Sequence, residues 1–173
     1  LNSMKIVYYT DQIYLHGGLE RVLANKLNYL SKLPDIELHV ITFQQNNNKP
    51  CYEINKKVIF HDLDIKYDRA FSFLNPNNLR FIFSHFKKLR NVLIKIKPDV
   101  IVVCNYEFGF YFVPLISKSS INIKEYHSSK HFETIAKTKN KSFIKKLTYK
   151  ITDYFEAKYN HLALLNPDEI KYF

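Results

Sequence analysis

The fold of this chain is decided by the stretch from Lys5-Ile-Val-Tyr-Tyr-Thr10, through residues 11–16, to Gly17-Gly18-Leu19-Glu20-Arg21-Val22-Leu23. The first part has the apolar and aromatic composition of a buried strand, and the last part begins an amphipathic helix. The chain has three glycines, and two of them stand together at this strand-to-helix turn. Adjacent glycines permit an unusual bend or the close approach of another group, and a helix N-terminus attracts phosphate. The pattern predicts an α/β protein that holds an anionic group at Gly17 and Gly18.

Two common phosphate-binding motifs do not fit this turn. The dinucleotide-binding fingerprint requires the frame G-x-G-x-x-G and an acidic residue after the second strand, where this chain has Phe43-Gln44-Gln45. A P-loop requires Gly-Lys followed by Ser or Thr, which the sequence does not contain. A Gly-Gly pair is also an ordinary turn in many proteins, so the pair alone identifies no ligand.

Composition narrows the class of protein. The 173 residues are 46% hydrophobic and suit one globular domain, for which we take residues 4–173. We interpret Leu1-Asn2-Ser3 as a cloning remnant. Two cysteines, no signal peptide and no membrane-length apolar run favour a cytoplasmic location. The net charge of +10 indicates an anionic partner such as a phosphorylated substrate, a membrane surface or a nucleic acid.

Strand and helix patterns alternate along the whole chain. Strands are predicted at residues 5–9, 37–43, 57–61, 100–104, 122–126 and 162–165, and loops at 44–55 and 64–78. Helices are predicted at 19–33, 108–117 and 142–159, along a second segment that contains Leu79 to Ile96 and is ended by Pro98-Asp99, and from Asn166-Pro167 onward. The apolar face of the second helix is predicted to be Leu79, Ile82, Phe83, Phe86, Leu89, Leu93 and Ile96. This alternation predicts a Rossmann-like parallel sheet with helices on both faces.

Ligands of such sheets bind beyond the carboxyl ends of the strands. His127 follows the fifth predicted strand and stands next to two serines, which favours a functional histidine over a surface one. Asn105, Tyr106 and Glu107 follow the fourth strand. The candidate residues are therefore concentrated at one edge of the sheet.

At this point the chain resembles the family 4 glycosyltransferases, whose opening strand is followed by G-G-x-E-R. The matching residues are Gly17-Gly18-Leu19-Glu20-Arg21, the junction Lys97-Pro98-Asp99-Val100-Ile101 and Glu125-Tyr126-His127-Ser128. The resemblance covers nearly the whole chain. It implies the GT-B fold, in which an N-terminal domain binds the acceptor and a C-terminal domain holds most of a nucleotide-sugar donor.

The resemblance also implies roles for individual residues. Gly17 and Gly18 would face the donor diphosphate, and His127 would assist the transition state of a transfer that retains anomeric configuration. The acceptor side would be shaped by Glu20, Arg21, Asn105, Tyr106, Glu107 and Ser128. No cofactor or metal is expected, and we interpret Asp62-Leu63-Asp64, a match to the D-x-D metal motif, as charge in a loop.

The family's donor-binding domain, with its E-x7-E segment, has no counterpart in these 173 residues. We therefore expect the chain alone to be inactive, and the full-length protein to be a hexosyl- or other glycosyltransferase. Its role would be in the synthesis of a bacterial surface polysaccharide or glycoconjugate. The acceptor would be a glycan or a lipid-linked molecule.

The basic segment from Lys137 to Lys150 leaves two readings open. Phe143, Ile144, Leu147 and Ile151 form an apolar edge that either packs on the sheet or meets an anionic membrane peripherally beside the lysines. A different function class also remains, a basic α/β module that binds nucleic acid. That alternative requires aromatic and basic side chains together on an exposed surface, whereas Phe83 and Phe86 are predicted to lie in the core.

Overall fold

The computed structural model describes residues 3–71, 75–129, 134–135 and 142–172. The strands are β1 (Met4–Thr10), β2 (Ile36–Thr42), β3 (Ile59–Asp62), β4 (Val100–Val103), β5 (Ile121–Glu125) and β6 (His161–Ala163). The helices are α1 (Gly18–Leu30), α2 (Pro76–Leu79), α3 (Ile82–Ile96), α4 (Phe108–Ile116) and α6 (Phe143–Glu156), and the 3₁₀ helix η1 spans Pro167–Tyr172. Every predicted strand is present, whereas α2 begins inside a predicted loop.

The six strands form one parallel sheet in the order β3-β2-β1-β4-β5-β6. Val7 of β1 pairs with His39 of β2 on one side and with Ile101 of β4 on the other. The strand order therefore reverses between β1 and β4, and such a reversal opens a crevice at the carboxyl ends of the strands. This topology confirms the predicted Rossmann-like α/β fold.

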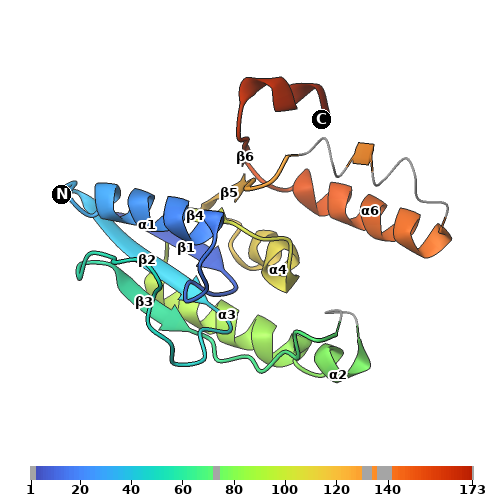
Figure 1. The fold of residues 1–173 in the computed structure, drawn as a ribbon, viewed down its shortest axis with the longest axis horizontal. Helices are drawn as coiled ribbons and strands as arrows, with labels where there is room; N and C mark the ends of the chain where they lie inside the picture. Colours follow the sequence, from blue (N-terminus) through green and yellow to red (C-terminus); the bar gives the residue numbers. More distant parts are fainter. Residues whose placement is uncertain (1–2, 72–74, 130–133, 136–141, 173) are drawn as a thin grey trace.

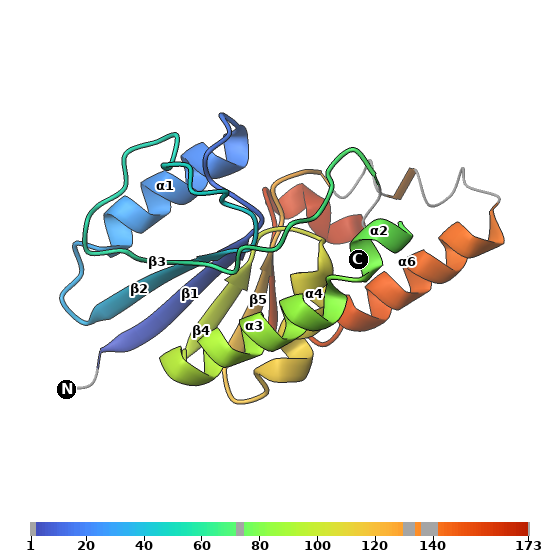
Figure 2. The ribbon, with the colours of Figure 1, turned by 90° about the horizontal axis from the view of Figure 1, so that it is seen from below.

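Helices cover both faces of the sheet, as Figures 1 and 2 show. On one face, Leu23 and Leu27 of α1 pack with Tyr8, Val40 and Val102 of the strands. On the other face, α3 and α4 pack on the alternate strand residues. That second cluster contains Val7, Tyr9, Ile41, Val103, Leu89, Leu93, Phe110 and Val113. Strands buried on both faces explain why the strand segments are almost continuously apolar.

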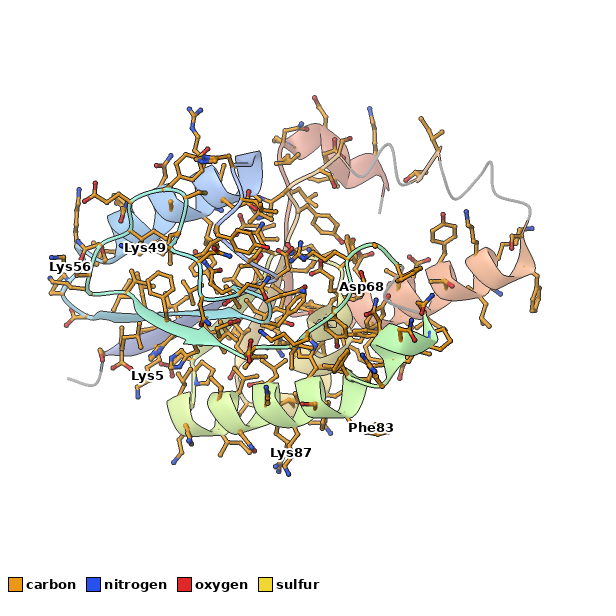
Figure 3. All side chains as sticks on the ribbon, turned by 60° about the horizontal axis from the view of Figure 1, so that its bottom comes forward. Lys5, Lys49, Lys56, Asp68, Phe83 and Lys87 are labelled. Carbon is orange, nitrogen blue, oxygen red and sulfur yellow. The ribbon has the colours of Figure 1, made fainter. Side chains whose placement is uncertain are left out.

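The apolar face predicted for α3 was wrong at one end. Phe83 is 85% exposed, and it points away from the molecule together with Lys87 in Figure 3. His85 is fully buried instead, and it lies on the same side as Leu89 and Ile96. The two positions are about 200° apart around a helix, so they cannot share a face.

His85 is buried because two tyrosines satisfy its ring. Its Nε2 is 2.7 Å from the hydroxyl of Tyr9, and its Nδ1 is 2.9 Å from the hydroxyl of Tyr67. Burial lowers the pKa of His85 to about 3, so the ring is neutral at physiological pH. Gly109 of α4 completes this packing, because a Cβ there would overlap Cε1, Cζ and the hydroxyl of Tyr9.

In the C-terminal part of the chain, β5 and β6 extend the sheet, and helix α6 between them lies against α4. Helix α6 packs on α4 through the edge-to-face contact of Phe155 with Tyr111 (5.3 Å between ring centroids). The predicted cap of the last helix is confirmed, since Asn166 Oδ1 accepts a hydrogen bond from the backbone N–H of Asp168 (2.9 Å). Within the described parts of the chain, no helix has both the length and the apolar character needed to cross a membrane.

Candidate active site

The glycine pair lies at the N-terminus of α1, at the carboxyl end of β1. Gly17 caps the helix with an extended backbone (φ −154°, ψ 171°), and Arg21 N donates the first helical hydrogen bond to its carbonyl (3.2 Å). No described glycine has a positive φ, so the pair does not serve an unusual bend. The N-cap has no side chain that bonds the first amides of the helix. The amide groups of this turn therefore form a potential anion site.

The two glycines differ in what surrounds them. A Cβ on Gly17 would collide with the carboxylate of Glu20, whereas a Cβ on Gly18 would meet nothing within 4 Å. Gln12, which the sequence analysis missed, holds Glu20 in this position by donating to its Oε1 (2.6 Å). Gln12 Oε1 also accepts from the backbone N–H of Tyr14 and Leu15 (2.7 and 2.8 Å). Gly18 is thus the more open of the two positions.

His127 lies in a charged cluster at the end of β5. Its Nε2 is 3.2 Å from Oε1 of Glu125, and the same oxygen accepts a hydrogen bond from Lys26 Nζ of α1. His127 Nε2 is buried and makes no hydrogen bond within the described residues, because it is not aligned with the carboxylate. Burial lowers the pKa of His127, and Glu125 opposes this effect.

The cluster is connected to the glycine turn. Lys26 comes from α1, and its bond to Glu125 ties that helix to the end of β5. The glycine turn follows β1 and His127 follows β5, so both lie at the carboxyl edge of the parallel sheet. Ser128 is exposed beside His127, and Arg21 is exposed on α1.

A second polar cluster surrounds Asp11 at the end of β1. The side-chain amide of Asn105 donates to Asp11 Oδ1 (2.7 Å), and Nη2 of Arg69 donates to Oδ2 (3.0 Å). Arg69 Nε also donates to Gln44 Oε1 (3.0 Å), which joins the end of β2 to this cluster. Asp11 follows the first strand, where the sequence places candidate residues, whereas Arg69 was not predicted because it comes from a long loop far along the chain.

Glu107 is the most perturbed carboxyl group at this edge. Burial, with the nearby negative charge of Asp11, raises its pKa to about 7. Its Oε2 is buried without a hydrogen-bond partner among the described residues. Such a group exchanges a proton near neutral pH and has an acceptor atom free for a ligand hydroxyl.

Tyr106 points elsewhere, toward α6. Its hydroxyl donates to Glu156 Oε1 (2.7 Å), and its ring faces Lys124 Nζ (4.5 Å to the centroid). Lys124 is 1% exposed and donates to the carbonyls of Cys104 (3.1 Å) and Glu125 (2.7 Å). This buried lysine, whose pKa is lowered to about 8 by burial, fastens the carboxyl ends of β4 and β5 together.

A cavity of about 330 Å³ opens beside these strand ends, between Tyr106, Ser128 and α6. Aromatic rings and hydroxyl groups dominate its lining, which includes Tyr106, Tyr111, Tyr149, Ser128, Ser129, Thr148 and Thr152. Aromatic faces pack on the apolar faces of sugar rings, and hydroxyls bond to sugar hydroxyls. The cavity brings Tyr106 and Ser128 together.

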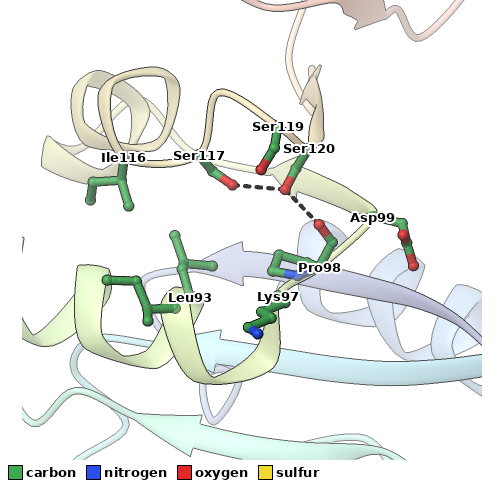
Figure 4. Close-up of a pocket in the computed structure, with 9 residues that line it drawn as sticks. Leu93, Lys97, Pro98, Asp99, Ile116, Ser117, Ser119 and Ser120 are labelled. Carbon is green, nitrogen blue, oxygen red and sulfur yellow. Dashed lines mark hydrogen bonds between the residues drawn. The ribbon is translucent and has the colours of Figure 1, made fainter.

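A larger cavity of about 500 Å³ lies at the opposite edge, where β4 and β5 begin (Figure 4). Two of the serine hydroxyls that line it, those of Ser117 and Ser120, bond within the protein. Ser120 Oγ donates to the carbonyl of Pro98 (2.5 Å) and bonds to Ser117 Oγ (2.7 Å), as the dashed lines in Figure 4 mark. The position at the amino ends of the strands, away from the switch point, argues against a role in chemistry.

The D-x-D sequence makes separate local contacts. Asp62 Oδ1 accepts from Thr42 Oγ1 and from Gln45 N (both 3.1 Å), whereas Asp64 pairs with Lys66. Leu63 between them is buried. Within the described ranges, no group of three His, Cys, Asp or Glu side chains could hold a metal ion.

The fold is shared with a solved sucrose-phosphate synthase from Thermosynechococcus elongatus. The superposition has a TM-score of 0.67 at 12% sequence identity, and it covers 98% of this chain and 44% of that chain. No model of a protein family and no curated protein sequence matches this chain. The chain therefore spans less than half of the length of that synthase, and the likeness establishes the Rossmann-like fold.

Proposed function

We propose that this chain is the N-terminal, acceptor-binding domain of a retaining GT-B glycosyltransferase of family 4. The full-length enzyme would move a sugar from a nucleotide-sugar donor to a glycan or lipid-linked acceptor, in surface polysaccharide or glycoconjugate synthesis. The observation that carries the proposal is the meeting of two features at one edge of the sheet. These are the N-terminus of α1 at Gly17-Gly18, which has no side-chain cap, and the pair of buried Glu125 and half-buried His127.

The glycine turn suits the departing diphosphate of the donor. The first amides of α1 and the helix dipole favour negative charge, and that charge increases on the phosphate as the sugar leaves. Gly18 is the better position for contact, because no atom lies within 4 Å of its would-be Cβ. Glu20 occupies the space next to Gly17 and would direct the phosphate toward Gly18 by charge repulsion.

His127 suits the reacting sugar. Its lowered pKa favours a neutral ring, and Nε2 has no hydrogen-bond partner within the described residues. A neutral imidazole can bond a sugar hydroxyl or the developing charge without repelling a partly cationic sugar ring. Glu125 Oε1 lies 3.2 Å from Nε2 of His127, and Lys26 pairs with the same carboxylate.

Acceptor binding would use the other half of the edge. Glu107 offers a buried oxygen without a hydrogen-bond partner among the described residues, and Asn105 stands next to it on Asp11. The aromatic cavity beside Tyr106 and Ser128 has the lining that a sugar ring needs. Arg21 is exposed at the start of α1, where it can meet a phosphate on the acceptor.

The first test is the reading frame of the native gene beyond Phe173. The proposal expects a second α/β domain with an E-x7-E segment, because the donor needs a second wall. The full-length protein is then assayed with a panel of UDP- and GDP-sugars, and the anomeric configuration of the product is determined by NMR. Transfer with retention supports the proposal, and transfer with inversion contradicts it.

Substitution of His127 tests the site itself. His127→Ala in the full-length protein is expected to lower kcat by about 100-fold or more, with donor KM changed much less. The matched control is His161→Ala at the exposed start of β6, which should retain full activity. The 173 residues alone should show no transfer under the same conditions, and activity of that fragment would refute the predicted division of the active site.

A further inference from the structure

Helix α6 has an outward face that the fold does not use. Its inward face is fixed by contacts with α4 and the loop that precedes α4: Thr152 bonds to Tyr111 (3.2 Å), Phe155 contacts Tyr111, and Glu156 accepts from Tyr106. Two of these inward residues, Thr152 and Glu156, are polar. The helix therefore does not follow the usual arrangement of apolar residues inside and polar residues outside.

Four apolar or aromatic residues of α6 are exposed to solvent instead. Phe143 is 80% exposed, Leu147 50%, Ile151 44% and Tyr154 61%. Their spacing of four, four and three residues puts them on one side of the helix, opposite Thr152 and Glu156. The sequence left two readings open for this apolar edge, packing on the sheet or contact with a membrane. The exposure of Phe143, Leu147 and Ile151 contradicts the first reading, because these side chains do not pack on the sheet.

Lysines border this apolar face. Lys146 and Lys150 are exposed one helical turn apart along one side of it, and Lys158 lies just beyond the helix with its Nζ 4.4 Å from the centre of the Tyr154 ring. Asp153 is the acidic residue exposed on the outer side of the described helix. The segment from Lys137 to Lys141, which the sequence analysis included, lies outside the described residues.

We infer that the outward face of α6 docks on an anionic lipid bilayer, with the helix lying in the plane of the membrane. The apolar side chains would enter the boundary between headgroups and acyl chains, while the lysines bond to phosphates of the lipid headgroups. An apolar face bordered by lysines is complementary to the surface of an anionic bilayer, which offers both acyl chains and negative charge. A neutral protein groove would cover the apolar face but leave the lysines without opposite charges. The inference does not depend on the proposed enzymatic activity.

The test is co-sedimentation of the 173-residue chain with vesicles. One set contains phosphatidylcholine alone, and the other contains equal parts of phosphatidylcholine and phosphatidylglycerol. We expect at least about tenfold tighter binding to the anionic vesicles, because each lysine near the surface adds to the attraction. Equal binding to both sets, or binding to neither, would overturn the inference.

Two double variants that change the net charge equally test which surface of the protein binds the vesicles. Lys146→Glu/Lys150→Glu should lower binding to anionic vesicles by about tenfold or more. Lys49→Glu/Lys56→Glu alters two exposed lysines on a distant loop, labelled in Figure 3, and should change binding much less. Equal losses in both variants would show diffuse attraction by net charge and would refute a docking face on α6.

The apolar contribution needs its own variant. Phe143 is the first residue of α6 and is mostly exposed, so Phe143→Ser keeps the core intact. We expect it to weaken binding to anionic vesicles with no change in the far-UV circular dichroism spectrum. Retained binding in Phe143→Ser and in Leu147→Ser would mean that the apolar face does not enter the bilayer, and would overturn the proposed geometry.

Discussion

The atoms next to Gly109 and Gly18 determine whether a Cβ can be added at each position. A methyl group on Gly109 would overlap the ring of Tyr9, whose hydroxyl is held by His85 (2.7 Å) in a fully buried site. The ring cannot move without breaking that bond, so Gly109→Ala should destabilise the protein by about 1 to 3 kcal/mol despite the better helix propensity of alanine. Urea denaturation of purified protein measures this free energy of unfolding.

Gly18→Ala is the matched control for that substitution. Gly18 is also helical, but nothing lies within 4 Å of its would-be Cβ. The variant should be as stable as the parent protein or more stable by up to about 1 kcal/mol. If Gly109→Ala and Gly18→Ala unfold at the same urea concentration, the packing of Tyr9 against α4 is wrong.

Glu107 predicts a particular dependence of stability on pH. Its carboxyl group has a pKa near 7 in the folded state, against 4.5 for the unconstrained group, so the folded protein binds the proton more tightly. The contribution of Glu107 to stability is therefore complete below about pH 4.5 and is lost as the pH rises toward 7. Above pH 7 no further change is expected from this group.

Comparison with Glu107→Gln isolates this effect from the other groups that titrate in the same range. The stability of the native protein minus that of Glu107→Gln should fall by about 2 to 3 kcal/mol between pH 4.5 and pH 7. Urea denaturation at a series of pH values gives this difference. A flat difference for Glu107→Gln would contradict a buried, perturbed carboxyl group.

At the scale of elements, helix α3 was predicted at the right place in the chain, but one of its predicted inward-facing residues was wrong. His85 is fully buried between Tyr9 and Tyr67, whereas Phe83 is 85% exposed. His85→Ala leaves a cavity and two buried hydroxyls without their partner, which should cost about 3 kcal/mol. Phe83→Ala should change the free energy of unfolding by less than about 0.5 kcal/mol. The reverse order of these two effects, measured by urea denaturation, would mean that the helix is rotated.

The elements themselves could be predicted from the sequence because their signals are local. Apolar runs in the strands and the Pro98 that follows α3 require no knowledge of the tertiary structure. The inward face of α3 could not be predicted, because a histidine is buried only where two tyrosines from β1 and a distant loop bring hydroxyls to it. Hydropathy therefore assigned Phe83 to the core in its place.

The residues of the candidate site were also predictable only where their signal is local in the sequence. Gly17, Gly18, His127 and Glu107 lie between the end of a strand and the element that follows or at the start of that element, so their place at the carboxyl edge follows from the parallel sheet. Lys26 and Arg69 reach the edge from a helix and a long loop, and only the closed tertiary structure brings them to Glu125 and Asp11. Strand β5 contained one local signal that was not used: Lys124, a charged residue inside a strand pattern.

At the scale of the whole molecule, the net charge of +10 raises the nucleic-acid alternative again. One argument against it was that Phe83 belongs to the core, and the structure removes that argument, since Phe83 is exposed near Lys87 on the outer side of α3 (Figure 3). A binding module of this kind would stack bases on Phe83 and bond phosphates with the lysines. The glycosyltransferase proposal expects only diffuse attraction between opposite charges.

Binding to a single-stranded DNA oligonucleotide distinguishes these two functions. If attraction is diffuse, the dissociation constant should lie at about 10⁻⁴ to 10⁻⁶ M in physiological salt and weaken steeply as salt increases. Phe83→Ala should then leave it unchanged, because net charge is unchanged. A base stacked on Phe83 would add about 1 to 3 kcal/mol, so the same substitution would weaken binding by about five- to 150-fold. A loss of that size, measured by fluorescence anisotropy at two salt concentrations, would favour a nucleic-acid-binding module over the glycosyltransferase, because diffuse charge gives no reason for one aromatic ring to matter.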